Sequence, residues 1–140
     1  MEQKLQYIVD KISELNIQIN EKQAEQFFRY YELLVEWNGF MNLTGITDFE
    51  EVVCKHFVDS LSIISTKDMS TVDNLIDIGT GAGFPGLPLK IAFPNVKVTL
   101  LDSLNKRIQF LNHVIEETGL TDIETIHGRA EDFAKPGQKR

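Results

Sequence analysis

The sequence predicts an α/β protein in which a helical N-terminal region, residues 1–70, precedes a parallel sheet, residues 71–140. Up to about Ser70, apolar residues recur every three or four positions, as on one face of an α-helix. After Ser70, three short apolar runs with β-branched residues alternate with helical stretches. Strand, helix, strand, helix, strand in this order is typical of a doubly wound parallel sheet.

Three helices are expected in the N-terminal region. The first carries an apolar face made of Leu5, Ile8, Val9, Ile12 and Leu15. Asn20 and Gln23 form a capping pair at the start of the second helix, which ends near residues 37–39. Its stripe is Ala24, Phe27, Phe28, Tyr31, Leu34 and Val35, whose rings suit a core better than base stacking. Asp48 and Glu51 have capping-box spacing, so a third helix, or a broken pair, should continue to about Ile64.

The expected strands cover residues 72–78, 96–101 and 123–126. Before the last of them, residues 103–120 carry a helical apolar stripe, and Gly119 is placed to end that helix. Ligands of parallel α/β sheets bind beyond the carboxyl ends of the strands. The glycine-rich stretch 79–86 directly follows the first strand, so we expect the ligand there.

Composition restricts the function classes. A chain of 140 residues is about one domain long, and its net charge of −7 counts against a broad nucleic-acid-binding face. Cys54 is the single cysteine, so an intrachain disulfide and a thiolate metal cluster are excluded. We predict no metal site. Neither a membrane-length apolar run nor a signal peptide is recognisable, which predicts a cytoplasmic protein.

The stretch DIGTGAGFPG, residues 77–86, was compared with known glycine-rich motifs. Gly81, Gly83 and Gly86 match G-x-G-x-x-G, the dinucleotide fingerprint, but that fingerprint should begin directly after the strand, where Gly79 stands. No lysine follows Gly86, which excludes the P-loop. An acidic residue followed by glycines at alternate positions suits a ligand that brings an ammonium group toward Asp77. A nicotinamide-dependent oxidoreductase domain is the alternative.

Several blocks together resemble a known family. DIGTGAGFPG resembles motif I of the class I S-adenosylmethionine-dependent methyltransferases. With WNGFMNLTGI, KHFVDSL, LLDSLNKR and HGRAEDF, it resembles the bacterial 16S ribosomal RNA guanine-N7 methyltransferases, also called glucose-inhibited division protein B. The resemblance implies a Rossmann-like sheet, S-adenosylmethionine as cofactor, and methyl transfer to N7 of a guanine in 16S ribosomal RNA or the small ribosomal subunit.

The resemblance also implies roles for individual residues. Gly79 and Phe84 would line the methionine and ribose part of the cofactor site, and Ala130 and Glu131 would contact the adenine. Asp102, about twenty residues after the glycines, would accept the ribose hydroxyls, unless it only caps the following helix. The cofactor-binding residues predicted in all are Asp77, Gly79, Gly81, Phe84, Asp102, Ala130 and Glu131.

No catalytic acid or base is assigned, because guanine N7 carries a lone pair and no proton. Arg129 is the favoured contact to RNA phosphate among the candidates Lys55, Lys90, Lys106, Arg107 and Arg129. Cys54 is expected in the core. For His56, a packed or capping role and RNA contact remain open.

The number of strands leads to a further expectation. The resemblance to class I methyltransferases implies a sheet of seven strands, with the third, second and first on one side. Residues 71–140 supply only these three. We therefore expect residues 1–140 to be the front part of a longer enzyme, inactive by themselves. The unpaired edge of the first strand should make them self-associate or leave them partly unfolded. A fragment that binds the cofactor without transferring a methyl group is the second alternative.

Overall fold

The computed structural model describes residues 2–63, 69–129 and 131. Helices α1 (Glu2–Ser13) and α2 (Glu21–Asn38) come first. The segment that follows is a single helical run, α3 (Phe49–Val52), the π-helical η1 (Val53–Val58) and α4 (Asp59–Ser62), and a 3-10 turn, η2 (Met69–Thr71), precedes the sheet. The predicted helical N-terminal region is confirmed, and the third helix is continuous with a π-helical centre.

Both predicted helix starts are confirmed by their caps. Asn20 Oδ1 accepts a hydrogen bond from the Gln23 amide, and Gln23 Oε1 accepts one from the Asn20 amide, each at 2.8 Å. Asp48 Oδ2 accepts from the Glu51 amide at 3.2 Å. These side chains satisfy amides that have no partner within the first turn of a helix.

The sheet contains β1 (Asn74–Ile78), β2 (Lys97–Asp102) and β3 (Ile123–His127), all parallel, in the order β1-β2-β3. Helices α5 (Gly86–Ala92) and α6 (Asn105–Thr118) connect them, and α6 ends at Gly119 with a φ of 71°. This order confirms the predicted α/β class. The first strand begins later than predicted because the Val72 amide still bonds to Met69 in the 3-10 turn.

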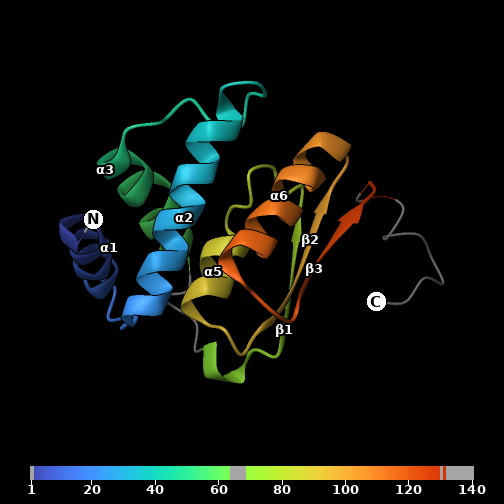
Figure 1. Cartoon of the computed structure of the whole chain (residues 1–140). Helices are drawn as coiled ribbons and strands as arrows, with labels where there is room; N and C mark the ends of the chain where they lie inside the picture. The colour runs from blue at the N-terminus through green and yellow to red at the C-terminus, as the bar shows by residue number, and fades with distance from the viewer. Residues whose placement is uncertain (1, 64–68, 130, 132–140) are drawn as a thin grey trace.

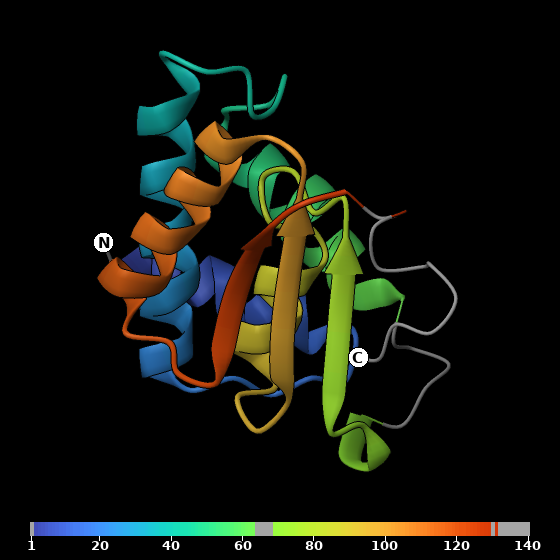
Figure 2. The same cartoon turned by 90° about the vertical axis from the view of Figure 1, so that its right-hand side faces the viewer.

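The elements form layers on one side of the sheet. Helices α5 and α6 lie against the sheet, α2 lies on them, and α1 and α3 are outermost (Figure 1). Figure 2 shows the strands in front with the helices behind. Ile76 and Ile78 of β1 are 42% and 50% exposed, and among the described strands β1 pairs with β2 alone. The unpaired edge predicted for the first strand is therefore present.

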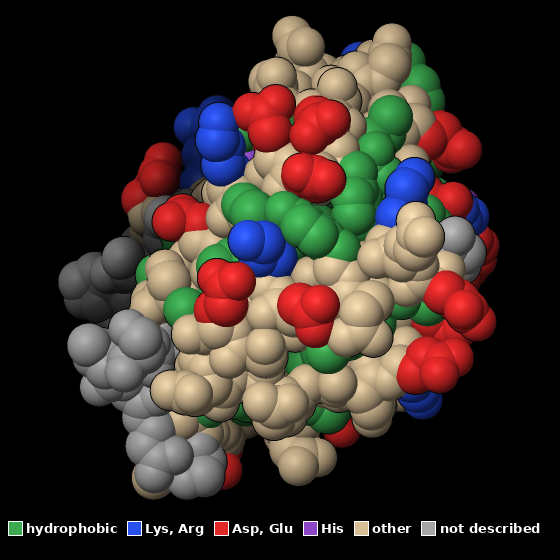
Figure 3. All heavy atoms as spheres, turned by 90° about the vertical axis from the view of Figure 1, so that its left-hand side faces the viewer, with side chains coloured by type: hydrophobic (Ala, Val, Ile, Leu, Met, Phe, Trp, Pro, Cys, Tyr) green, Lys and Arg blue, Asp and Glu red, His purple; other side chains and the backbone are tan. Residues whose placement is uncertain are grey.

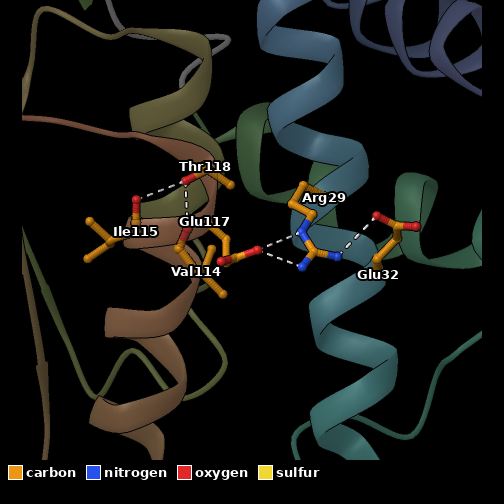
Figure 4. Close-up of polar contacts among 6 residues, drawn as sticks. All are labelled: Arg29, Glu32, Val114, Ile115, Glu117 and Thr118. Atoms are coloured by element: carbon orange, nitrogen blue, oxygen red, sulfur yellow. Dashed lines mark hydrogen bonds and ion pairs between the residues drawn. The ribbon is translucent and has the colours of Figure 1, made fainter.

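Side chains of α2 join the N-terminal helices to the sheet. Gln23 Nε2 donates to the Ile91 carbonyl at 2.9 Å and Gln26 Nε2 donates to the Thr118 carbonyl at 3.0 Å, so both reach C-terminal carbonyls of α5 and α6. Arg29 contacts Glu117 of α6 at 2.6 Å (Figure 4). Residues 1–70 and 71–140 thus share one packed body where they are described, and their division into two regions stays a sequence prediction.

The core extends through all the layers. Phe27, Phe28 and Leu34 are buried as predicted, whereas Val35 is exposed. Tyr30 and Leu33, absent from the predicted stripe, are fully buried because α2 is packed on two sides, by the outer helices and by α5 and α6. On the outer face formed by α1 and α3, acidic and basic side chains are interspersed around a strip of apolar ones (Figure 3).

Candidate functional site

The glycine-rich loop, residues 79–86, runs from the end of β1 into α5. Gly79, Gly81 and Gly83 have φ angles of 70°, 60° and 103°, a backbone region that disfavours L side chains. A Cβ atom added at Gly79 or Gly81 would meet no atom within 4 Å. These two glycines therefore border open space, as a bound ligand would require.

The other two glycines of this loop serve packing. A Cβ atom at Gly83 would lie 2.6 Å from the Tyr30 hydroxyl and 2.5 Å from a methyl carbon of Leu87. At Gly86 it would collide with Leu100 and approach Asp77 Oδ2 to 3.0 Å. The loop thus contains an open half followed by a packed half.

Asp77 lies beneath the loop and holds its shape. Its side chain is buried, and Oδ2 accepts hydrogen bonds from Thr80 Oγ1 at 2.7 Å and from the Gly86 amide at 2.9 Å. Burial raises the pKa of Asp77, and these two hydrogen bonds oppose that shift. Pairing with a ligand ammonium, as the sequence predicts, would have to use the other oxygen, Oδ1.

Asp102 ends β2 and is 2% exposed. Its Oδ2 accepts from the Gly81 amide at 2.8 Å, and its Oδ1 accepts from the Leu104 amide at 2.9 Å. Arg107 of α6 lies 3.6 Å from Oδ1. Leu104 occupies the N-cap position of α6, so Asp102 is not that cap. Each carboxylate oxygen can accept a second hydrogen bond, which leaves Asp102 able to bind a hydroxyl.

A cleft of about 480 Å³ lies at the carboxyl ends of all three strands. Its size is within the range of small-molecule and cofactor sites. It is lined by Ile78, Gly79, Leu101, Asp102, Ser103, Arg107, Gly128, Arg129 and Glu131. Carboxylates, guanidinium groups and an open glycine therefore share one hollow at the edge where parallel sheets bind ligands.

The predicted site residues do not all reach this cleft. Gly79, Asp102 and Glu131 line it, together with Arg129, the predicted RNA contact. Gly81 is tied to it through Asp102. Asp77 lies below the loop, and Ala130 lies outside the described residues.

Phe84 is not among the residues that line the cleft. Its ring stacks on His56, with centroids 4.4 Å apart and planes inclined by 17°. His56 is half-buried, its Nε2 lies 2.7 Å from Thr44 Oγ1, and burial lowers its pKa. His56 therefore has the packed role that was one of its two possibilities, and its contact with RNA stays a prediction.

Two other residues differ from expectation. Lys90 as an RNA contact is wrong, because its side chain is 1% exposed and donates to the carbonyls of Pro94 and Val96 at 2.8 and 2.7 Å. Cys54 is only partly buried, with Sγ 3.5 Å from the Tyr7 hydroxyl. Lys55 is exposed and pairs with Glu51 at 2.9 Å.

In residues 2–63, 69–129 and 131, the acidic, His and Cys side chains form no group of three or more that could hold a metal.

Sequence reasoning missed Tyr30. It is fully buried, and its hydroxyl donates to the Ala82 carbonyl at 2.5 Å. Its position three residues after Phe27 and four before Leu34 has helical spacing and could have identified it as a core residue. Its bond to the glycine loop had no signal in the sequence.

Comparison with known proteins gives a consistent result. Residues 23–139 match the protein family described as rRNA small subunit methyltransferase G. A curated protein of that name from Lachnoclostridium phytofermentans is 56% identical over 127 residues, which cover 91% of this chain and 52% of the relative. The protein of that name from Staphylococcus carnosus is 53% identical over 92% of this chain and 54% of its own length. The one from Alkaliphilus metalliredigens is 52% identical over 94% of this chain and 55% of its own length. The chain spans about half the length of the curated relatives it matches.

Among the described helices, none has the length and apolarity to cross a membrane.

Proposed function

Because this chain belongs to the rRNA small subunit methyltransferase G family, we propose that its protein transfers a methyl group from S-adenosylmethionine to N7 of a guanine in 16S ribosomal RNA. The observation that carries the proposal is the cleft that open Gly79 and the buried carboxylate of Asp102 both line. The relatives are named for ribosomal RNA of the small subunit. Such an enzyme would act in the cytoplasm, where ribosomes are.

The residues of the cleft fit this cofactor. Gly79 lines the cleft, and both Gly79 and the nearby Gly81 border open space that a ligand could fill. Asp102 can accept hydrogen bonds from ribose hydroxyls. Glu131, also in the cleft, is proposed to contact the adenine together with Ala130. Asp77 and Phe84 are proposed to support the loop around the methionine part, Asp77 from beneath.

The chemistry places few demands on side chains. The sulfonium of S-adenosylmethionine supplies an electrophilic methyl group, and guanine N7 offers a lone pair without a proton to remove. The residues therefore need to hold N7 in line with the methyl group and to exclude water. Orientation of this kind can lower the activation barrier by roughly 7–11 kcal/mol at most. Arg129, an exposed residue that lines the cleft, is proposed to bind an RNA phosphate.

The packed half of the loop disfavours the dinucleotide alternative. In G-x-G-x-x-G the second glycine allows the backbone to approach a pyrophosphate closely. Here that glycine is Gly83, whose Cβ direction points at Tyr30 and Leu87. The space is thus filled by the protein's own side chains.

The test uses the full-length protein with methyl-labelled S-adenosylmethionine and small-subunit RNA that lacks the modification. Nucleoside mapping should place the label on N7 of one guanine. Calorimetry in parallel should show binding of S-adenosylhomocysteine and none of NAD. Binding of S-adenosylhomocysteine without transfer would support the alternative of a cofactor-binding protein, and binding of NAD alone would contradict the proposal.

A further inference from the structure

Two sequence blocks outside the cleft meet at the glycine-rich loop. WNGFMNLTGI, residues 37–46, covers the end of α2 and the turn after it, and KHFVDSL, residues 55–61, covers the second part of η1 and most of α4. Neither block lines the cleft. Both are connected to Phe84 by a chain of contacts.

The chain of contacts begins at Asn38. Its Oδ1 accepts hydrogen bonds from the amides of Leu43 and Thr44, at 2.7 and 2.9 Å, and so closes the turn after α2. The Thr44 hydroxyl then lies 2.7 Å from His56 Nε2, and the His56 ring stacks on Phe84. The contact with Thr44 orients the His56 ring, and the stacked face of that ring packs against Phe84 of the loop.

Tyr30 contacts the same part of the loop from α2. Its buried hydroxyl donates to the Ala82 carbonyl, and its ring lies 5.7 Å from that of Phe84 and stacks on Phe57 at 5.3 Å. The hydroxyl also occupies the space that a side chain at Gly83 would need. Residues 82–84 therefore contact three side chains of the N-terminal helices, Tyr30, His56 and Phe57, whose ring lies 6.4 Å from that of Phe84.

These contacts address a physical problem of the loop. Its open half has left-handed backbone angles at Gly79 and Gly81, and glycine has more conformational freedom to lose than other residues. Asp77 and Asp102 fix the loop from the sheet. On the side of the N-terminal helices, the polar contact to residues 82–84 comes from Tyr30, and the His56 ring lies closest to Phe84, at 4.4 Å against 5.7 and 6.4 Å for Tyr30 and Phe57.

We propose that Tyr30 and His56 are positioning residues, which hold residues 82–84 of the loop so that its open half is preformed for the cofactor. The proposal rests on the cofactor site proposed above. Neither residue needs to touch the cofactor. Their loss should therefore weaken cofactor binding while the cleft-lining side chains and the RNA contacts stay unchanged.

Tyr30→Phe in the full-length protein tests the first residue. Removal of one hydroxyl should raise the Kd for S-adenosylhomocysteine about threefold to tenfold, the range expected for one net hydrogen bond. The KM for S-adenosylmethionine should rise in parallel, and the KM for RNA should not change. Tyr31→Phe is the matched control, because the neighbouring Tyr31 also donates to a loop carbonyl, that of Thr47 at 3.3 Å, away from the glycine-rich loop.

Two substitutions separate the contacts of His56. His56→Phe retains the ring for stacking on Phe84 and loses the bond to Thr44, whereas His56→Gln retains a polar group and loses the stack. We expect both to raise the Kd. Hydrogen exchange should be faster in a peptide that covers residues 79–86 and unchanged in one that covers α6, which a general loss of stability would not produce.

The outcomes are distinguishable. If Gly79→Val abolishes binding while Tyr30→Phe and both His56 variants bind with unchanged Kd, the positioning roles are contradicted and the cofactor site stands. If Tyr30→Phe alters the KM for RNA as much as that for S-adenosylmethionine, the effect is general and the proposal is also wrong. If the unaltered protein does not bind S-adenosylhomocysteine, both the proposed function and this inference fail.

Discussion

The amide of Gly81 donates a hydrogen bond of 2.8 Å to Oδ2 of Asp102, although 21 positions separate the two residues. The bond connects the open half of the loop to the end of β2. The same carboxylate holds the Leu104 amide before α6. Asp102 thus shapes the cleft as well as lining it.

Asp102→Ala should therefore weaken binding of S-adenosylhomocysteine by about 1.5–3 kcal/mol, the range for hydrogen bonds to a charged group. Asp102→Asn should have a smaller effect, because its amide oxygen can still accept from one backbone amide. Titration calorimetry measures both, with the exposed Asp73→Ala as control. Equal affinity for all three variants would exclude Asp102 from the site.

Gly79→Val should abolish cofactor binding, because the side chain would enter the open space beside the cleft. A matched control exists in Gly119, whose φ of 71° is close to the 70° of Gly79 and whose Cβ position is equally open. Gly119→Val carries similar backbone strain at the end of α6, outside the cleft. Its affinity for S-adenosylhomocysteine should match that of the unaltered protein, and a loss in both variants would point to strain alone.

Methyl transfer should be nearly independent of pH between about 6.5 and 8.5, because the proposed acceptor needs no deprotonation. The measurement is a single-turnover rate with saturating cofactor and RNA, so that binding does not contribute. A tenfold rise across this range would indicate a base and a different acceptor atom.

His56 should make stability depend on pH. Burial lowers its pKa in the folded state below the usual value of 6.5, and the charge of Asp59 opposes this only in part. Below about pH 6.5 the unfolded chain then binds more protons than the folded one, so the free energy of unfolding falls as pH falls. Urea unfolding between pH 7.5 and 5.5 should show a steeper loss for the unaltered protein than for His56→Phe. Parallel curves would contradict a neutral, packed His56.

A polypeptide of residues 1–140 should associate through β1, whose outer edge is unpaired among the described strands and whose Ile76 is 42% exposed. Sedimentation should show association that Ile76→Lys reduces. Ile63→Lys, which replaces an isoleucine that is 57% exposed on another element, should not reduce it. A monomer with a β1 protected from hydrogen exchange and with measurable methyl transfer would disprove this expectation.

The amino-acid sequence determined the features that depend on local pattern. Helical spacing, capping pairs and β-branched runs predicted the helical region and the parallel strands, because each reflects contacts between residues close in the chain. The alternation of strand and helix fixed the edge of the sheet where Gly79 and Asp102 meet. The motif blocks identified the family.

The tertiary structure alone decided how each residue is used. Gly79 and Gly83 look equivalent in the sequence, yet Gly79 borders open space and Gly83 is packed against Tyr30. Tyr30 also donates a hydrogen bond to Ala82 of the same loop, 52 positions away in the chain. The sequence suggests that Lys90 is a surface cation, but in the structure its side chain is buried and donates hydrogen bonds to two backbone carbonyls. Such contacts join segments that are distant in the chain. The burial and the hydrogen-bond partners of these residues depend on how the helices pack on the sheet, and a local sequence pattern does not contain that information.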